Sequence, residues 1–283
     1  MSELRVEALT HIYSAGTPFQ KTAIENISLT IPSGQFVGLL GHTGSGKSTF
    51  IQHLNALLAP SSGTVYVDGE DINRDKKSRR AVKNKVGLVF QYPEYQLFEE
   101  TVFADIAFGP KNMGLGKDEI EQRVREAAGF VGVAEELFQR SPLELSGGQK
   151  RRIAIAGVIA MRPGILILDE PTAGLDPAGC RQIMDNICRY REESGATVMI
   201  VSHNMDDAAR LTERLIVFNH GSIAMDGTPE QVFSQPEKLV EIGLNVPQST
   251  ALAMELRKRG LPLQGAIFTH GQLMAALKEV GAC

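Results

Sequence analysis

The sequence predicts an α/β fold with a mostly parallel, doubly wound sheet. Short apolar runs alternate with helical patterns, an antiparallel pattern occupies the beginning of the chain, and the strand pattern disappears over one long middle stretch. Continuous apolarity over four or five residues is typical of strands covered on both faces, and strand–helix alternation favours parallel pairing. We therefore expect a parallel α/β core, an antiparallel β layer, an inserted α-helical subdomain and a small C-terminal extension.

The expected elements follow from the positions of these patterns. Core strands are expected over residues 37–40, 86–90, 165–168, 198–201 and 215–218, and helices over 48–58, 177–194 and 205–214. Alternating runs at 5–9, 27–31 and 64–67, bounded by turn residues such as Pro32-Ser33-Gly34, predict the antiparallel layer.

The middle and the end of the chain read differently. Between Gln91 and Leu145 no strand pattern occurs, and residues 118–131 form an amphipathic, charged helical pattern. After about Gly227, prolines separate short helical patterns, and Thr269 is suited to cap the last helix. We expect a core domain over 1–226, with the helical subdomain inserted at about 92–160, and a helical extension over 227–283.

Composition bounds the classes of function. The 283 residues are 43% hydrophobic and 22% charged with a formal net charge of −4, so no strongly basic domain points to nucleic acid as a partner. No stretch reaches the roughly 18 consecutive apolar residues of a membrane-spanning helix, and the N-terminus shows no signal-peptide pattern. Cys180, Cys188 and Cys283 are too few and too scattered for a disulfide framework. Any role at a membrane is expected to act through a partner.

A phosphate-binding loop is the first motif that carries chemistry. Residues Gly41-His42-Thr43-Gly44-Ser45-Gly46-Lys47-Ser48 match G-x-x-x-x-G-K-[ST] between a predicted strand and a predicted helix. Glycines let backbone N–H groups approach an anion, and the helix N-terminus adds a partial positive charge. Lys47 is suited to the β- and γ-phosphates and the Ser48 hydroxyl to Mg²⁺. The loop predicts nucleotide binding.

Two acids, Asp169 and Glu170, end the apolar run 165–168. A strand of this kind delivers its terminal acids to the sheet edge where the phosphate loop lies. Asp169 is placed to hold Mg²⁺ directly or through water. Glu170 is next in sequence, points differently, and is suited to polarise or deprotonate a water that attacks the γ-phosphate.

A second glycine-rich helix start, Leu145-Ser146-Gly147-Gly148-Gln149, precedes a strong helical pattern over 150–161. It forms a second platform for an anion. A chain that already has one phosphate loop has no evident use for a second platform in the same site. A platform that completes the site of another molecule accounts for it.

The ordered set of motifs resembles a known family. The phosphate loop, Gln91 at a strand end, residues 145–149, Asp169-Glu170, Leu175-Asp176 and His203 are similar in order and spacing to the motifs of ABC transporter ATPases over roughly residues 4–225. The resemblance implies a P-loop NTPase (RecA-like) core that binds and hydrolyses ATP with Mg²⁺. It also implies a head-to-tail pair of ATPase subunits, in which each site combines the phosphate loop of one subunit with residues 146–148 of the other.

The resemblance implies roles for individual residues. Glu170, His203 and Lys47 are the expected catalytic residues, with His203 contacting the γ-phosphate and orienting Glu170 and water. Tyr13 is expected to stack on adenine, with Phe19 as a rival because the segment 14–21 is long. Asp176 would bridge the two subunits, and Ser48, Gln91 and Asp169 would contact the metal. The implied nucleotide contacts are Tyr13, Gly41, His42, Thr43, Gly44, Ser45, Gly46, Lys47, Ser48, Thr49, Gln91, Ser146, Gly147, Gly148, Gln149 and Asp176.

One subfamily of these ATPases is the most similar. Residues 91–98, Gln91-Tyr92-Pro93-Glu94-Tyr95-Gln96-Leu97-Phe98, with their continuation to residue 114 and the segment 16–19, resemble the ATPases of energy-coupling factor (ECF) transporters, and most closely the second of their two ATPase subunits. The resemblance implies a transmembrane coupling protein, a substrate-binding membrane protein, uptake of vitamins or transition-metal ions, and a peripheral place at the cytoplasmic face of the cell membrane.

The aromatic residues of this segment are partly consistent with contact with a transmembrane coupling protein. Tyr92, Tyr95, Leu97 and Phe98 form a dense apolar cluster in an expected loop, which suits a partner helix. Packing within the helical subdomain is the alternative.

Two other functions stay open. An ABC ATPase that acts on nucleic acid or on the ribosome usually carries long coiled-coil insertions or two cassettes in one chain, and neither pattern occurs here. The other is a stand-alone nucleotide-binding module or kinase that uses the same loop. Residues 145–149 and His203 argue against it, since a kinase would need an acceptor-substrate site instead. The transported solute, the direction of transport and the choice between an identical and a related second ATPase stay open at this point.

Overall fold

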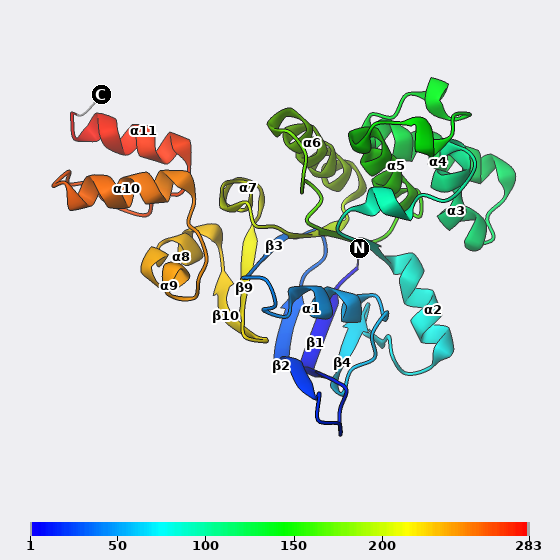
Figure 1. The fold of residues 1–283 in the computed structure, drawn as a ribbon, viewed down its shortest axis with the longest axis horizontal. Coiled ribbons are helices and arrows are strands. Elements are labelled where there is room, and N and C mark those ends of the chain that lie inside the picture. Colours follow the sequence, from blue (N-terminus) through cyan, green and yellow to red (C-terminus); the bar gives the residue numbers. More distant parts are fainter. Residues whose placement is uncertain (1, 282–283) are drawn as a thin grey trace.

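The structure is a computed structural model that describes residues 2–281, so Cys283 lies outside the described residues. Its centre is a six-stranded sheet in the order β10-β9-β3-β8-β7-β6. Figure 1 labels β10, β9 and β3 of this sheet. The strands are β3 (Phe36–Leu40), β6 (Val86–Val89), β7 (Ile165–Asp169), β8 (Thr197–Val201), β9 (Arg214–Asn219) and β10 (Ser222–Gly227). All neighbours pair in parallel except β10, which is antiparallel to β9. The predicted parallel α/β core is confirmed.

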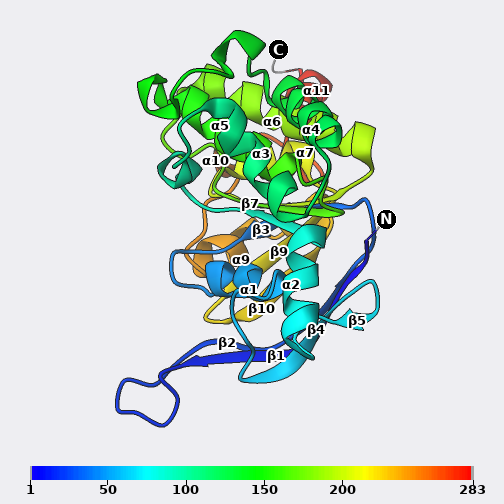
Figure 2. The same ribbon diagram turned by 90° about the vertical axis from the view of Figure 1, so that its right-hand side faces the viewer.

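A second, antiparallel sheet lies beside the first. It contains β2 (Lys21–Ile31), β1 (Leu4–Tyr13), β4 (Ser62–Val67) and β5 (Glu70–Asp71), in the order β2-β1-β4-β5. Figure 2 shows this sheet below the parallel sheet, and most of the helices above them both. The predicted antiparallel layer is therefore confirmed, and β1 and β2 extend several residues beyond the runs that predicted them.

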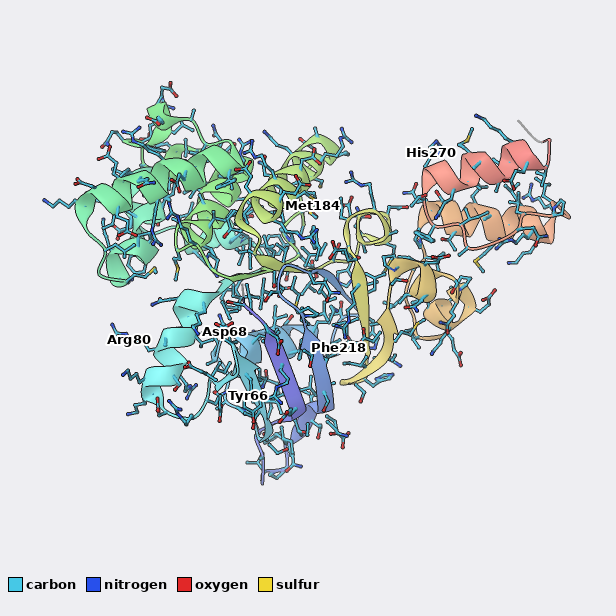
Figure 3. All side chains as sticks on the ribbon, turned by 180° about the vertical axis from the view of Figure 1, so that it is seen from behind. Tyr66, Asp68, Arg80, Met184, Phe218 and His270 are labelled. Carbon is cyan, nitrogen blue, oxygen red and sulfur yellow. The ribbon has the colours of Figure 1, made fainter. Side chains whose placement is uncertain are left out.

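The alternation of side chains explains why the core strands are apolar throughout. Along β7, Leu166 and Leu168 pack in the cluster with the helices, whereas Ile165 and Ile167 pack in the cluster with the antiparallel layer. Successive residues of a strand point to opposite faces, and here both faces are covered. Phe218 of β9, labelled in Figure 3, belongs to the cluster with the antiparallel layer.

Three helices flank the strands that carry the predicted motifs. They are α1 (Lys47–Leu54), α6 (Pro177–Ser194) and α7 (Met205–Leu211). The expected bounds of α6 are confirmed, but α1 and α7 end earlier than predicted. Residue 214 was wrongly placed in α7, because Arg214 pairs with Val37 as the first residue of β9. After α1, the apolar residues Ala56, Leu57 and Leu58 continue the helical pattern although the helix has ended. After α7 the residues are polar, and the backbone is already extended at Thr212.

The stretch between β6 and β7 contains the 3₁₀ helix η1 (Pro93–Gln96) and the helices α3 (Val102–Asn112), α4 (Lys117–Val131) and α5 (Gly147–Ile159), with short 3₁₀ turns η2 (Glu135–Leu137) and η3 (Pro142–Glu144). One helix was missed: α2 (Lys76–Lys85) precedes β6. Six of its ten residues are Lys or Arg and Val82 is its one buried residue, so it shows almost no apolar stripe.

The C-terminal helices are α8 (Pro229–Phe233), α9 (Pro236–Glu241), α10 (Gln248–Lys258) and α11 (His270–Glu279). The cap at Thr269 is confirmed, since its side chain accepts a hydrogen bond from the Gln272 backbone and the Gln272 side chain accepts one in return. α8 packs on the core through Val232 and Phe233, whereas α10 and α11 share a small cluster of their own. The domain bounds at residues 226 and 92–160 stay predictions. Within residues 2–281, no helix has the length and apolar character needed to cross a bilayer.

Candidate functional site

The phosphate loop joins β3 to α1, as its motif requires. Gly41 and Gly46 have φ angles of 153° and 107°, which side chains rarely adopt. A Cβ atom on Gly41 would lie 2.6 Å from the Phe218 carbonyl oxygen, and one on Gly46 would lie 2.7 Å from the Ala23 carbonyl oxygen. Both positions therefore require glycine, because neighbouring backbone leaves no room for a side chain and the φ angles disfavour one.

Lys47 is buried at the floor of the loop. Its Nζ donates hydrogen bonds to the carbonyl oxygens of Gly41 at 2.7 Å and His42 at 3.0 Å. Burial lowers the pKa of the Lys47 ammonium, and the charges of Asp169 and Glu170 oppose that shift. A buried cation within a glycine-rich loop suits the terminal phosphates of a nucleotide.

Asp169 brings the predicted metal ligands together. It ends β7 with 8% of its surface exposed, and its Oδ2 accepts a hydrogen bond from the Ser48 hydroxyl at 3.4 Å. Burial raises the pKa of the Asp169 carboxyl, and the neighbouring charge of Glu170 adds to the rise. Within the described part of the chain, no group of three or more His, Cys, Asp or Glu side chains forms a metal cluster. One carboxylate and one hydroxyl are the sparse oxygen set that Mg²⁺ uses when phosphates supply further ligands.

Glu170 stands between two other predicted residues. Its Oε2 accepts a hydrogen bond from Gln91 Nε2 at 2.8 Å, and its Oε1 lies 2.9 Å from His203 Nε2. Its φ angle of 48° is unusual for a residue with a side chain, and its N–H donates to the Val201 carbonyl oxygen. This turn separates the directions of Asp169 and Glu170, as the sequence suggested. The three side chains come from segments that follow β6, β7 and β8.

These residues line one open cavity of about 570 Å³. Among the predicted residues, its lining includes Tyr13, Thr43, Gly44, Gly46, Lys47, Ser48, Thr49, Gln91, Asp169, Glu170 and His203. Gly41, His42 and Ser45 belong to the loop but do not line the cavity. The lining further contains five residues that sequence reasoning missed, which are Lys21, Thr22, Ala23, His220 and Gly221. They come from the start of β2 and the β9–β10 turn, and no motif marks them.

Tyr13 and Phe19 occupy different places. Tyr13 lines the cavity, and its hydroxyl lies 3.2 Å from the Thr49 hydroxyl. Phe19 is 85% exposed in the hairpin loop between β1 and β2, which projects at the lower left of Figure 2. The geometry therefore favours Tyr13 for stacking on a base.

The second glycine-rich segment forms a separate hollow. Ser146 caps α5, its side chain accepting from the Gln149 N–H while the Gln149 side chain accepts from the Ser146 N–H. Ser146, Gly148, Gln149 and Asp176 line a cavity of about 670 Å³ that shares no lining residue with the phosphate-loop cavity. Gly147 is the first residue of α5 and does not line it. Asp176 caps α6 by accepting from the Gly179 N–H at 2.7 Å.

Arg151 connects three segments of the site. It is buried in α5, and its guanidinium forms a two-point ion pair with Glu94 of η1, at 2.9 Å from Nε to Oε2 and 2.5 Å from Nη2 to Oε1. It also donates to the carbonyl oxygen of Ala173, between Glu170 and Asp176. Partial burial works to raise the pKa of Glu94, yet the hydrogen bonds from Arg151 hold it below the usual value. No sequence motif marks this pair, since its members lie 57 positions apart.

The aromatic cluster after Gln91 divides into exposed and packed residues. Tyr92, Tyr95 and Phe98 are 43%, 84% and 65% exposed, whereas Leu97 packs against the core of the helical stretch. Phe98 also contacts Phe108 of α3 edge-on, with ring centroids 4.9 Å apart. The segment is thus attached through Leu97 and presents aromatic rings outward.

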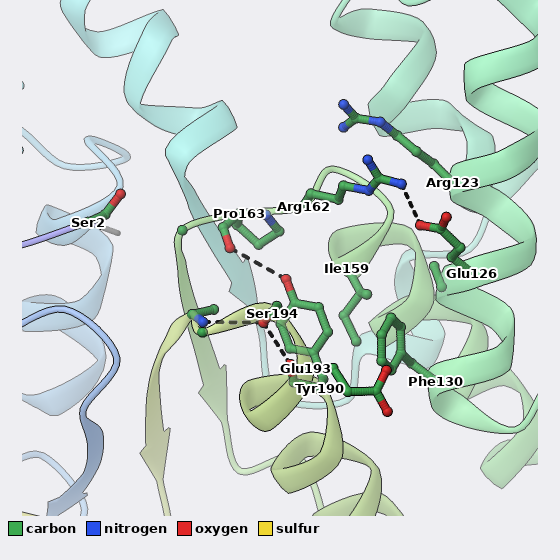
Figure 4. A pocket seen from close by; sticks show the side chains of 14 residues that line it. Ser2, Arg123, Glu126, Phe130, Ile159, Arg162, Pro163, Tyr190, Glu193 and Ser194 are labelled. Atoms are coloured by element: carbon green, nitrogen blue, oxygen red, sulfur yellow. Dashed lines mark hydrogen bonds and ion pairs between the residues drawn. The ribbon is translucent and has the colours of Figure 1, made fainter.

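A further cavity, of about 430 Å³, lies away from these residues. Pro163 and Gly164 on its wall precede β7, so it is at the edge of the sheet opposite the phosphate loop. Figure 4 shows Arg162 paired with Glu126 across its rim, and the Tyr190 hydroxyl bonded to the Pro163 carbonyl oxygen. These contacts hold α4 and α6 against the start of β7. None of the predicted site residues lines this cavity.

The buried charge of Asp169 leads to a prediction about stability. Because the pKa of Asp169 is raised in the folded protein, its ionised form opposes folding at neutral pH, and this opposition disappears as the pH falls through the raised pKa. We expect Asp169→Asn to raise the free energy of unfolding of the ligand-free protein at pH 7 by about 1 kcal/mol. The gain should shrink as the pH approaches the ordinary aspartate pKa of about 4.

Thermal and urea unfolding measure this difference. Asp185→Asn is the matched control, because Asp185 is exposed on α6 and should change stability little. A less stable Asp169→Asn protein at pH 7 would show that the hydrogen bond from Ser48 outweighs burial.

Comparison with known proteins agrees with this geometry. A family described as ABC transporter matches residues 24–173, more than half of the chain. The chain is 54% identical over 266 residues to the energy-coupling factor transporter ATP-binding protein EcfA2 of Caldanaerobacter subterraneus subsp. tengcongensis, covering 94% of this chain and 93% of that protein.

Two solved structures are similar throughout their length. One is cbiO1 from Clostridium perfringens, described as part of the ABC transporter complex cbiONQ, with a TM-score of 0.75 and 39% identity over 89% of this chain and 98% of that one. The other is the ATP-binding cassette MJ0796, a dimer in a post-hydrolysis state bound to ADP and Pi, with a TM-score of 0.72 and 30% identity over 80% and 98% of the two chains. The chain therefore belongs to the ABC transporter ATPases, among the ATP-binding proteins of energy-coupling factor transporters.

Proposed function

We propose that this chain is the ATP-hydrolysing subunit of an energy-coupling factor importer that drives uptake of vitamins or transition-metal ions through membrane partners. The observation that carries the proposal is the arrangement of Gln91, Glu170 and His203 at the rim of the phosphate-loop cavity, together with a second, separate platform at Ser146. The first arrangement suits hydrolysis, and the second suits a partner subunit.

The residues of the cavity account for each part of the reaction. Loop N–H groups and Lys47 hold the phosphates, and Tyr13 stacks on the base. Glu170 accepts a proton from a water whose oxygen attacks the γ-phosphorus, and the bond from that phosphorus to the bridging oxygen of ADP breaks. His203 contacts Glu170 and keeps its carboxylate aimed at the water. Gln91 reaches the same carboxylate from the segment that faces the membrane partner.

Ser48 and Asp169, with Gln91 nearby, would hold Mg²⁺. The pairing of a hydroxyl with a buried carboxylate of raised pKa supports this assignment, because a cation removes the cost of burying that charge. When bound, the ion neutralises charge that develops on the phosphate oxygens.

The separate platform supports a head-to-tail pair of ATPase subunits. Ser146, Gly148 and Asp176 line a hollow that shares no residue with the cavity of this chain's own phosphate loop. The helix N-terminus at Ser146 suits the γ-phosphate of a nucleotide held by a second subunit. ATP then lies between two chains and favours their closure, while hydrolysis releases it. The second subunit is a related or identical ATPase, and the related form is the one we propose.

The exposed rings of Tyr92, Tyr95 and Phe98 support docking of a transmembrane coupling protein. That protein would in turn bind the membrane protein that captures the solute. The chain would then lie peripherally at the cytoplasmic face of the cell membrane. Residues 1–226 would form the ATPase domain with its helical subdomain at about 92–160, and residues 227–283 a small extension.

Glu170→Gln should retain ATP binding, stabilise the closed pair and lower turnover by at least about a hundredfold, because an amide cannot accept the proton of the attacking water. Phosphate release and size-exclusion chromatography with ATP measure the two effects. Turnover near that of the wild type would show that another group is the base.

Ser146→Arg should leave ATP binding to the phosphate loop intact while blocking closure of the pair, because a long side chain would fill the platform. Binding of a fluorescent ATP analogue and the oligomeric state with ATP separate these steps. Glu144→Arg is the control, since Glu144 is exposed two residues before Ser146 and does not line the hollow. Loss of ATP binding in Ser146→Arg itself would contradict the shared site.

Recovery of partners from solubilised membranes tests the transport function. Integral membrane proteins should co-purify with the tagged chain, and their recovery should fall when Tyr95 and Phe98 are replaced by Ser. A preparation that instead recovers ribosomes or DNA, with no integral membrane protein, would favour the ABC ATPases that act on those targets.

A further inference from the structure

Helix α2 carries an unusual excess of positive charge. Its ten residues include six Lys or Arg and no Asp or Glu, although the whole chain has a net charge of −4. Lys76, Lys77, Arg80 and Lys83 are exposed, and within residues 2–281 none of them has a carboxylate within ion-pair distance. Arg80 is labelled on this helix in Figure 3. Like charges three or four residues apart repel one another, so the helix loses stability by carrying them without a counter-charge.

Three of these cations, Lys76, Arg80 and Lys83, line a shallow groove together with Arg79, whereas Lys77 lies outside its lining. The groove has a volume of about 280 Å³ and is lined by Lys76, Arg79, Arg80, Lys83 and the two residues Ala56 and Leu57 that follow α1. Arg79 is anchored there by a hydrogen bond to the Ala56 carbonyl oxygen at 3.3 Å. The spacing 76, 79–80 and 83 places the charged side chains on one face of the helix. Leu57 is 40% exposed and gives the groove an apolar floor.

The position of α2 shows what this groove can meet. In Figure 1 both α2 and α3 lie along the right-hand side of the molecule, and that side faces the viewer in Figure 2. α3 carries Phe108, which contacts the exposed Phe98 of the aromatic cluster. The basic groove and the aromatic cluster proposed to dock the coupling protein therefore share one side of the chain.

We propose that the basic groove of α2 binds the headgroups of anionic phospholipids in the membrane around the coupling protein. The inference rests on the proposed function, because it is that docking which brings this side of the chain to a bilayer. Flexible Lys and Arg side chains over a small apolar floor suit a headgroup phosphate and the start of its glycerol backbone. The contact would add a second attachment beside the protein partner and restrict rotation of the ATPase beneath it.

Two other polyanions fit the groove less well. α2 has no aromatic residue among its cations, so it offers no surface on which nucleic-acid bases could stack. An acidic segment of a protein would be expected to meet directional donors that are held in place, whereas here only Arg79 is anchored.

Vesicle binding tests the proposal. The purified chain is mixed with vesicles of phosphatidylcholine alone or of phosphatidylcholine with phosphatidylglycerol, and the bound fraction is measured by flotation. The wild type should bind only the vesicles with phosphatidylglycerol, and added salt should release it. Replacing Lys76, Lys77, Arg80 and Lys83 together by Gln should lower the partition coefficient at least about tenfold while ATP hydrolysis stays unchanged.

The matched control removes the same charges elsewhere. Lys238, Lys258 and Lys278 are exposed on the C-terminal helices, and Arg259, which pairs with Glu255, directly follows α10. Replacing all four by Gln should leave vesicle binding close to that of the wild type. Equal losses in both variants would mean that net charge alone governs binding and would overturn the proposal. Unchanged vesicle binding by the α2 variant would also overturn it, as would a loss confined to recovery of the coupling protein in detergent, which would mark a protein contact.

The same measurements keep the two proposals apart. Recovery of membrane proteins in detergent, where no bilayer is present, depends on the transport function and not on the lipid contact. If that recovery succeeds while anionic vesicles fail to bind the wild type, the lipid contact is wrong and the proposed function stands.

Discussion

The carboxyl edge of the parallel sheet is the constraint on which the rest of the structure depends. The adjacent strands β3, β8, β7 and β6 all run in one direction, so the segments that follow them must meet at one edge. Those segments carry the phosphate loop, His203, Glu170 and Gln91. The apolar residues that make each strand thus also decide where its terminal polar side chain lies. Chemistry and packing are specified by the same short runs of sequence.

The site carries charge that the fold alone would not favour. Lys47 and Asp169 are both buried, and burial lowers the pKa of the Lys47 ammonium and raises the pKa of the Asp169 carboxyl. Both shifts favour the uncharged form of the side chain. Their proximity compensates in part, because each charge stabilises the other. Phosphates and a divalent cation would complete the compensation. Packing on both faces of the sheet stabilises the fold enough to tolerate buried charges at this edge.

Features that depend on a regular local pattern of residues could be predicted from the sequence. Features that depend on contacts between distant residues could not. The five core strands and the cap at Thr269 follow from apolar runs and capping residues within a short window. α2 was missed because its many charged residues leave almost no apolar stripe. The end of α1 was placed too late because apolar residues follow the helix, and the end of α7 because Thr212, Glu213 and Arg214 include neither Gly nor Pro to mark it. Among site residues, motifs predicted those on the loop and the acids, whereas the lining from β2 and the pair of Arg151 with Glu94 depend on tertiary structure alone.

The ion pair between Arg151 and Glu94 has a consequence for recombination among related cassettes. Both members lie inside the helical stretch between β6 and β7, while the third contact goes to a backbone carbonyl, that of Ala173, outside it. A graft of this whole stretch from a relative would carry both charges together and would meet a carbonyl that every sequence supplies. A crossover placed between them, with a relative that lacks the pair, would instead leave one buried charge without its partner, a loss of several kcal/mol. The helical stretch between β6 and β7 can therefore be exchanged as one unit, because both charges of the ion pair lie within it.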